Sequence, residues 1–252
     1  MHIAILSDVH GNLSAFEAVL NEIERVGADM LVFAGDLCLF GPRPAECLRL
    51  LRDGRIASLR GNTDEWVVSQ DAMHPQFQAA LNWTAGQLIG EDLNWLGRLP
   101  FSLRVSPTEK AADDLLIVHA NPHNVNDILY PPEDFQIARY GEIRQTDQAL
   151  RDRLSGVEAA VLAFGHLHIP NMRSLGSITL VNVSSVSMPG DGDGRAKFAL
   201  LKWDGSGWQA THHRVAYSGE VEAEAFRANR PPGWEEAVAA LEKQGYYYPQ
   251  KI

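Results

Sequence analysis

The chain has 252 residues, of which 45% are hydrophobic, and it carries a formal net charge of −10 at pH 7. An acidic chain with scattered Lys and Arg argues against a broad phosphate-tracking surface, which extended nucleic acid requires. No apolar run reaches membrane-spanning length, and the first residues lead directly into a strand, so neither a membrane segment nor a secretion signal is expected. Two cysteines, Cys38 and Cys47, provide no framework of bridges and favour a reduced, cytoplasmic setting.

Strands and helices alternate in the first part of the chain. Residues 2–7, 30–34 and 56–59 are apolar runs of strand length, and residues 13–26 and 43–53 carry apolar side chains at helical spacing. This βαβαβ order favours parallel neighbouring strands, because crossover connections keep a common strand direction. Side chains that follow these strands are therefore expected at one edge of a sheet.

Polar side chains follow the three strands and also two later apolar runs, 115–118 and 159–164. These side chains are Asp8, His10, Asp36, Asn62, His119, His166 and His168. Ligands of open α/β sheets collect at the carboxyl ends of the strands, so the seven side chains are expected to converge. Oxygen and imidazole donors in this number can hold two divalent cations side by side.

Each of these motifs is weak on its own. An Asp-x-His sequence such as Asp8–His10 also describes a loop that caps a helix, and Gly35-Asp36 and Gly61-Asn62 are ordinary turn dipeptides. Their joint occurrence, in this order and at strand ends, is what favours a dinuclear hydrolytic site.

The middle and later parts of the chain predict further layers. Residues 76–97 have helical spacing and predict helices outside the first sheet. Four short runs separated by turns predict antiparallel strands of a second sheet, namely 171–175, 178–183, 197–203 and 208–215.

The C-terminal segment, about 217–245, contains two helical stretches interrupted by Pro231-Pro232. It either caps the sheet edge or forms a dimer contact in a homo-oligomer. No linker-like composition divides the chain, so residues 1–252 are predicted to form one domain.

Taken together, the motifs resemble the calcineurin-like metallophosphoesterases, specifically their small bacterial and archaeal phosphodiesterase branch. The resemblance covers about residues 1–204, and its motifs are Ser7-Asp8-Val9-His10-Gly11-Asn12, Gly35-Asp36, Gly61-Asn62-Thr63-Asp64, His119, Gly165-His166-Leu167-His168 and the segment 181–199. It implies an α/β fold, a four-layer α/β/β/α sandwich in which two mixed sheets are flanked by helices. The site is then expected between the strand-end loops of the two sheets.

The resemblance also assigns the seven ligands to two metals joined by one bridging carboxylate. One metal takes Asp8, His10 and His168, the other takes Asn62, His119 and His166, and Asp36 is the bridge. A carboxylate can offer one oxygen to each of two cations, which supports that assignment. Without thiolate ligands, Mn, Fe, Zn, Co and Ni all remain open as the metal, with Mn or Fe favoured.

The activity that the resemblance implies is hydrolysis of small phosphodiesters or phosphomonoesters, with a metal-bound hydroxide as nucleophile and Asp36 and Asn62 in the catalytic centre. One position departs from the family: members with Gly-Asn-His use that histidine at the leaving group, whereas this chain has Thr63. A hydroxyl is not a general acid near neutral pH, although it can donate a hydrogen bond to phosphate. His123 is the first candidate for a replacement acid.

The candidate substrate-binding residues are Asn62, Thr63, Asn121 and Arg195. Together with the acidic composition, they favour a small, nucleotide-like substrate. Two other functions are weighed against this one. A non-catalytic interaction scaffold is disfavoured by the intact ligand set, and a protein phosphatase by the lack of an extended groove signature and of a histidine at position 63.

Overall fold

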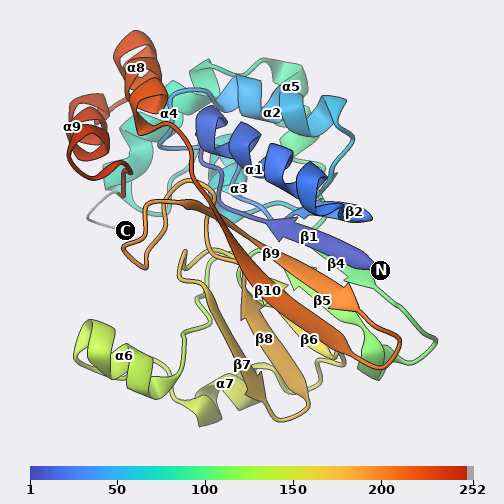
Figure 1. Cartoon of the computed structure of the whole chain (residues 1–252). Helices are drawn as coiled ribbons and strands as arrows, with labels where there is room; N and C mark the ends of the chain where they lie inside the picture. The colour runs from blue at the N-terminus through green and yellow to red at the C-terminus, as the bar shows by residue number, and fades with distance from the viewer. Residues whose placement is uncertain (249–252) are drawn as a thin grey trace.

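In the computed structural model, which describes residues 1–248, two sheets lie face to face between helices (Figure 1). The first sheet contains β1 (His2–Leu6), β2 (Met30–Phe33), β3 (Ala57–Ser58), β9 (Ala196–Trp203) and β10 (Trp208–Val215). The second contains β4 (Ser102–Val105), β5 (Leu115–Val118), β6 (Val161–Phe164), β7 (Asn171–Leu175) and β8 (Ile178–Asn182). Their strand orders are β10-β9-β1-β2-β3 and β4-β5-β6-β8-β7.

Both sheets are mixed. In the first, β1, β2 and β3 run parallel, and β9 pairs antiparallel with β1 and with β10. In the second, β5, β6 and β8 run parallel, whereas β4 and β7 are antiparallel edge strands. The parallel strands of each sheet therefore end at a common edge, where the polar motifs follow.

Helices connect and cover the strands. They are α1 (Leu13–Val26), α2 (Pro44–Asp53), α3 (Asn62–Ser69), α4 (Gln78–Gly86), α5 (Gly90–Leu96), α6 (Glu133–Tyr140), α7 (Asp147–Arg153), α8 (Gly219–Asn229) and α9 (Trp234–Gln244), with short 3₁₀ turns at Pro75–Phe77 and Ala111–Asp113. Local chemistry sets the ends of α1: Asn12 Oδ1 accepts the Ala15 N–H at 3.0 Å, and Gly27 closes the helix in the left-handed conformation.

The four predicted layers are confirmed. Side chains such as Ile5, Val32 and Ile117 fill the core between the two sheets. Phe16 of α1 and Leu48 of α2 pack on the outer face of the first sheet. Leu150 of α7 and Leu154, which follows that helix, belong to the core on the outer face of the second. Burial of these apolar faces is the main driving force that holds the layers together.

The prediction that the four late runs form one antiparallel sheet is wrong. Only β7 and β8 join the second sheet, where β8 runs parallel to β6, and β9 and β10 extend the first sheet beside β1. Alternation and turns identify strands but do not identify their partners. Ala199 and Phe198 of β9 are buried in cores on opposite faces of the first sheet, so β9 fits a position inside it.

The five ligand-bearing strands are likewise shared between the sheets. β1, β2 and β3 belong to the first, and β5 and β6 belong to the second. The helices predicted within 76–97 are α4 and α5, and Leu88 and Leu96 join the core on the outer side of the first sheet. Sequence patterns missed β4, α3, α6 and α7, all of which are short.

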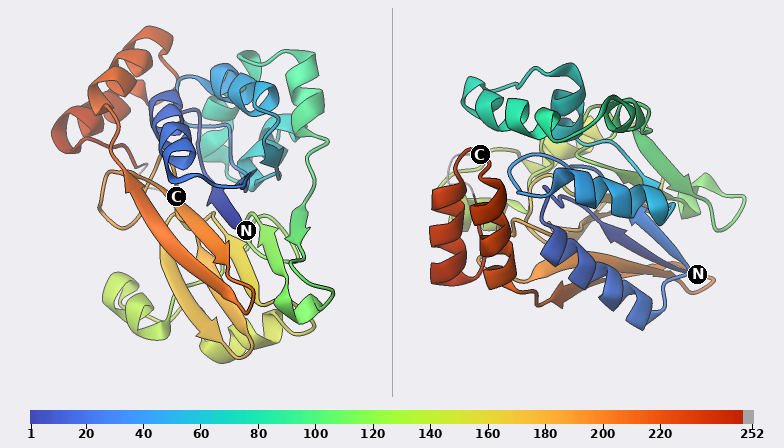
Figure 2. Two further views of the ribbon diagram at one scale, coloured as in Figure 1. Left: turned by 45° about the vertical axis from the view of Figure 1, so that its right-hand side comes forward. Right: turned by 90° about the horizontal axis from the view of Figure 1, so that it is seen from above.

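The C-terminal stretches form α8 and α9, which lie side by side at one end of the molecule (Figure 2). Helix α8 is fixed to the body of the chain by a buried ion pair between Glu222 and Arg43, which precedes α2. The prediction of one domain for residues 1–252 extends past the described residues and stays a prediction.

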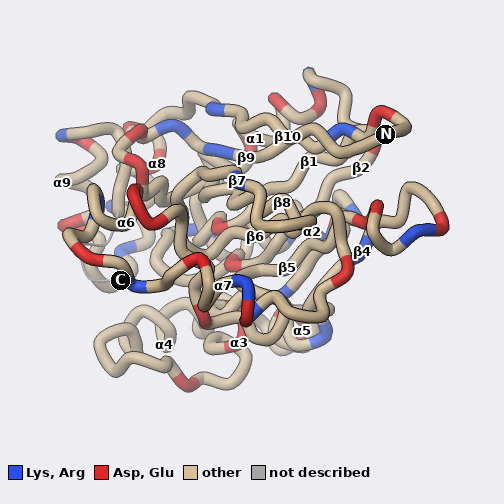
Figure 3. Tube along the Cα trace, turned by 90° about the horizontal axis from the view of Figure 1, so that it is seen from below, with Lys and Arg blue, Asp and Glu red and all other residues tan. Residues whose placement is uncertain are grey.

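Lys and Arg are spread along the whole trace (Figure 3). No helix of the described part of the chain combines the length and the apolar character that a membrane crossing needs.

Candidate metal centre

The loops that follow five strands meet at the facing edges of the two sheets. Two groups of potential metal ligands form there: Asp8, His10 and His168 in the first group, and Asp36, His119 and His166 in the second. Within each group the ligand atoms lie within 4.8 Å of one another. The first sheet supplies Asp8, His10 and Asp36, and the second sheet supplies the other histidines.

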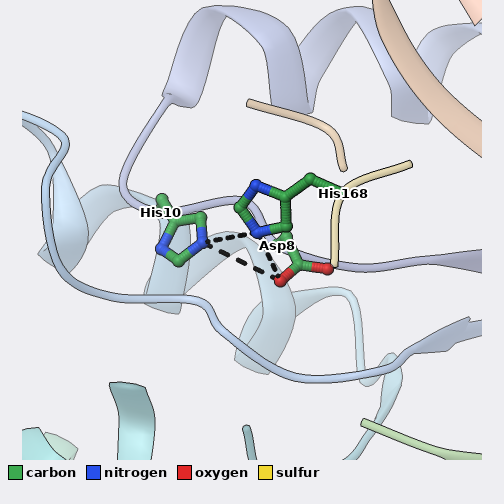
Figure 4. A group of neighbouring side chains, drawn as sticks. All are labelled: Asp8, His10 and His168. Carbon is green, nitrogen blue, oxygen red and sulfur yellow. Dashed lines mark hydrogen bonds and ion pairs between the residues drawn. The ribbon is translucent and has the colours of Figure 1, made fainter. Parts of the chain in front are cut away.

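The side chains of the first group point toward one another (Figure 4). His168 Nε2 lies 3.0 Å from Asp8 Oδ1, and His10 Nε2 lies 3.4 Å from His168 Nε2. His10 Nε2 is also 3.8 Å from Asp8 Oδ1. All three residues are buried, so their polar atoms have little access to bulk water.

In the second group, Asn62 at the start of α3 joins the three residues. His119 Nε2 lies 2.9 Å from Asn62 Oδ1 and 3.4 Å from Asp36 Oδ1. Asn62, Asp36 and His119 are buried, whereas His166 is partly exposed. The second group thus offers one carboxylate, one amide oxygen and two imidazoles.

Asp36, a member of the second group, also faces the first group. Its Oδ2 is 3.8 Å from His10 Nε2 of the first group, while its Oδ1 is 3.4 Å from His119 Nε2 of the second. The two oxygens of one carboxylate therefore face different ligand groups, which is the geometry that a bridging carboxylate needs.

Each of the four histidines has one ring nitrogen bonded to a backbone carbonyl. Nδ1 of His10, His119 and His168 lies 3.1, 2.9 and 2.8 Å from the carbonyls of Cys38, Ala34 and Met188, and His166 Nε2 lies 2.8 Å from that of Asn126. A nitrogen that donates to a carbonyl carries the proton, so the other nitrogen keeps its lone pair. This arrangement orients an imidazole as a metal ligand.

Burial keeps two of these imidazoles neutral. It lowers the pKa of His10 to about 3 and that of His166 to about 3. Burial also raises the pKa of Asp36 to about 7, where His119 opposes the rise and the nearby carboxylates of Asp8 and Asp64 add to it. Neutral imidazoles beside crowded carboxylates fit divalent cations, which would compensate the buried negative charge.

The backbone at the centre is strained. Asp8, His10, Asp36, His166 and His168 all have positive φ angles, between 47° and 64°. Non-glycine residues rarely adopt this left-handed conformation, and such residues cluster at functional sites. The left-handed residues all lie in the loops after β1, β2 and β6, where they turn the chain sharply at the site.

Close packing at the centre also requires a glycine. A Cβ atom at Gly61 would lie 2.0 Å from Asp36 Oδ1. Gly61 therefore lets the start of α3 approach the bridging carboxylate, and the Thr63 N–H donates to Asp36 Oδ1 at 2.9 Å.

Asp64 is a site residue whose role the sequence did not reveal. Its carboxylate accepts backbone N–H groups of Asp36, Leu37 and Gly61 at 2.9–3.0 Å. It thereby ties the loop after β2 to the start of α3. Asp64 stands in the motif Gly61-Asn62-Thr63-Asp64, and its position three residues after Gly61 is typical of a helix-start carboxylate, but neither signal indicated these contacts.

The other predicted residues make contacts of their own. Thr63 Oγ1 donates to the Cys38 carbonyl at 3.1 Å. The buried Asn121 accepts the His123 N–H at 2.8 Å, and it shapes the loop after His119.

His123 Nε2 lies 2.7 Å from the Arg153 carbonyl, so in this conformation the ring forms a hydrogen bond outside the two ligand groups. The guanidinium of Arg195 pairs with Asp193. Catalytic and substrate-binding roles for these residues stay predictions.

The chain resembles known proteins over most of its length. The family model of the calcineurin-like phosphoesterase superfamily domain matches residues 1–206. The chain is 28% identical over 238 residues to the uncharacterized protein MJ0912 of Methanocaldococcus jannaschii, covering 92% of this chain and 94% of that protein. It is 27% identical over 214 residues to phosphodiesterase YfcE of Escherichia coli, covering 81% and 89%.

A solved structure shares the fold. The metallophosphoesterase of Sphaerobacter thermophilus superposes with a TM-score of 0.72 at 26% identity, covering 95% of this chain and 98% of that chain. Together with the family match over most of its length, this similarity shows that the chain belongs to the calcineurin-like phosphoesterase superfamily.

Proposed function

We propose that this protein is a metal-dependent phosphodiesterase that hydrolyses small phosphorylated substrates at a dinuclear centre. The observation that carries the proposal is the position of Asp36, whose two oxygens face different groups of buried ligands. Two divalent cations bound there would supply an activated water and neutralise the charge that builds on the phosphoryl oxygens.

The chain's own residues hold and orient that centre. Asp8, His10 and His168 are the proposed ligands of one metal, and Asn62, His119 and His166 are those of the other. The four backbone carbonyls that bind the histidine rings fix which nitrogen faces the centre. The donors contain no thiolate, which leaves Mn, Fe, Zn, Co and Ni open, with Mn or Fe proposed.

The proposed substrates are nucleotide-like and have good leaving groups. With its hydroxyl bonded to Cys38, Thr63 provides no acid for the departing oxygen. Substrates whose leaving group departs without protonation suit such a site. Asn62, Thr63, Asn121 and Arg195 remain the proposed substrate contacts, and His123 remains the proposed donor if its ring turns away from Arg153.

The test is an activity screen of protein reconstituted with each candidate metal. Bis(p-nitrophenyl) phosphate, p-nitrophenyl phosphate and dinucleoside polyphosphates are offered in parallel, before and after chelation. We expect hydrolysis that is lost on chelation and restored by Mn or Fe. Asp71→Asn, which changes an exposed carboxylate, serves as the control for handling. A folded, metal-loaded protein that cleaves none of these compounds would instead support the scaffold alternative.

A further inference from the structure

The chain returns to the metal centre after α9. Three consecutive tyrosines follow this helix, and each makes a different contact. The ring of Tyr248 lies edge-on to His168, with centroids 6.1 Å apart, and the ring of Tyr247 lies 6.0 Å from that of Phe226 on α8. Tyr246 packs so closely on Gly194 that a Cβ atom at position 194 would lie 2.5 Å from its ring. This segment lies beyond residue 206, where the family match ends.

Contacts with the body of the chain hold this segment in place. Helix α8 is anchored by the buried pair of Glu222 with Arg43. Tyr247 lines a small cavity together with Glu222 and with His10, a second proposed ligand. The packing of Tyr246 and Tyr247 thus holds the segment that places Tyr248 beside the centre.

The guanidinium of Arg139 is linked to the backbone of His168 through hydrogen bonds of Gly190. Arg139, on α6, donates from Nη2 to the Gly190 carbonyl at 3.3 Å. The Gly190 N–H in turn donates to the His168 carbonyl at 2.8 Å. Arg139 thus reaches the backbone of His168 through Gly190, while Tyr248 contacts the His168 ring, so both side chains lie near the His168 side of the centre.

Arg139 has no carboxylate partner within ion-pair distance in the described part of the chain. Other arginines of this acidic protein form ion pairs with carboxylates, among them Arg144, Arg153, Arg173 and Arg195. The Arg139 side chain is also exposed. An exposed guanidinium without a carboxylate is free to bind phosphate oxygens in pairs, and a tyrosine hydroxyl can donate one more hydrogen bond.

We propose that Arg139 and Tyr248 form a subsite for a second phosphate, one anhydride link beyond the phosphorus that is attacked at the metal centre. This inference rests on the proposed function and narrows its substrate class to compounds with two or more linked phosphates, such as dinucleoside polyphosphates. A simple phosphodiester has no group that would occupy the subsite.

The kinetic test compares two substrates in the metal-reconstituted full-length protein. For Arg139→Ala and Tyr248→Phe, we expect the ratio of kcat/KM for diadenosine tetraphosphate to kcat/KM for bis(p-nitrophenyl) phosphate to fall about tenfold or more for the arginine variant and less for the tyrosine variant. The fall should lie in KM, because the contact is made with bound substrate as well as with the transition state. Arg139→Lys should recover part of the ratio, and Tyr246→Phe, which changes a neighbouring ring, is the matched control.

A binding measurement tests the subsite without turnover. Calorimetry of the metal-loaded protein with methylenediphosphonate and with methylphosphonate should show that Arg139→Ala weakens the diphosphonate about tenfold more than the monophosphonate. Equal effects on both ligands, or on both substrates, would overturn the subsite. If the unmodified protein cleaves neither substrate, the proposed function fails, and calorimetry still decides on the subsite.

Discussion

The carboxylate of Asp64 accepts the backbone N–H of Asp36 at 2.9 Å, so the proposed bridging residue is held by a second carboxylate through its main chain. The same carboxylate accepts the N–H groups of Leu37 and Gly61 at 3.0 Å. Asp64 does not belong to either ligand group, but its hydrogen bonds set the distance between the loop after β2 and the start of α3.

Asp64→Asn tests that positioning role. An amide turns an N–H₂ group toward backbone donors, so at least one of these hydrogen bonds is lost, at a cost of about 1–3 kcal/mol. We expect weaker binding of both metals, measured by competition with a chelator, and a lower free energy of unfolding. Asp204→Asn is the matched control, because Asp204 accepts backbone N–H groups in an exposed turn. Equal metal affinity in the two variants would contradict the positioning role.

Asp36→Ala tests the bridge. Since the described structure places the oxygens of Asp36 toward both ligand groups, its removal should leave two separate, weaker sites and nearly abolish turnover. Elemental analysis after dialysis measures the metal content per chain, and Asp71→Ala controls for the loss of an exposed carboxylate. Two tightly held metals together with substantial activity in Asp36→Ala would refute the assignment.

Thr63 sets a kinetic prediction. Because its hydroxyl donates to the Cys38 carbonyl and no acid stands at this position, the rate should depend strongly on the leaving-group pKa. A series of aryl and alkyl phosphodiesters measures that dependence. Thr63→His should flatten it, and His123→Ala should steepen it only if His123 is the donor. A series without any dependence in the chemical step would remove the argument for a missing acid.

Glu222 gives a prediction for stability against pH. Burial raises the pKa of this carboxyl above its ordinary value, although Arg43 opposes the rise. A carboxyl whose pKa is raised by folding binds its proton more tightly in the folded state. Its contribution is therefore fully present below pH 4.5, the ordinary value, and is lost as pH rises through the folded-state pKa.

The free energy of unfolding in urea is measured for the unmodified protein and for Glu222→Gln. The measurements run from pH 4.5, the ordinary pKa of this carboxyl, to about pH 8. The unmodified protein should lose stability relative to the variant as pH rises. Glu224→Gln, an exposed carboxylate on the same helix, should show no such trend. A relative gain with rising pH would mean that the pair with Arg43 outweighs the cost of burial.

Much of the fold follows from local patterns. Apolar runs such as 2–7 and 30–34 indicate buried strands, and the βαβαβ order indicates that these strands run parallel. Strand partners do not follow from these patterns, because pairing depends on faces and edges that are far apart in sequence. The position of β9 next to β1 is the clearest example.

The candidate site also has one part that the sequence predicts and another part that it does not. Its seven proposed ligands could be predicted because each stands at a strand end and has the chemistry of a metal donor. The contacts that hold these ligands in place could not be predicted from the sequence. The carbonyl of Asn126 that orients His166 and the approach of Tyr248 to His168 depend on loops and on the C-terminal segment, whose paths no periodicity encodes. A cytoplasmic location and a homo-oligomer also stay predictions.

The place of β1 bears on how the chain folds during synthesis. β1 is made well before β9, yet one of its edges pairs with that strand, which begins only at Ala196. An N-terminal portion that has left the ribosome before then exposes an unpaired apolar strand edge, the kind of surface that chaperones protect. Loops of the proposed metal centre are complete in sequence by His168, but Ser185 donates to the Asp8 carbonyl and Ser184 to that of His168, so the centre reaches its final shape only late in translation.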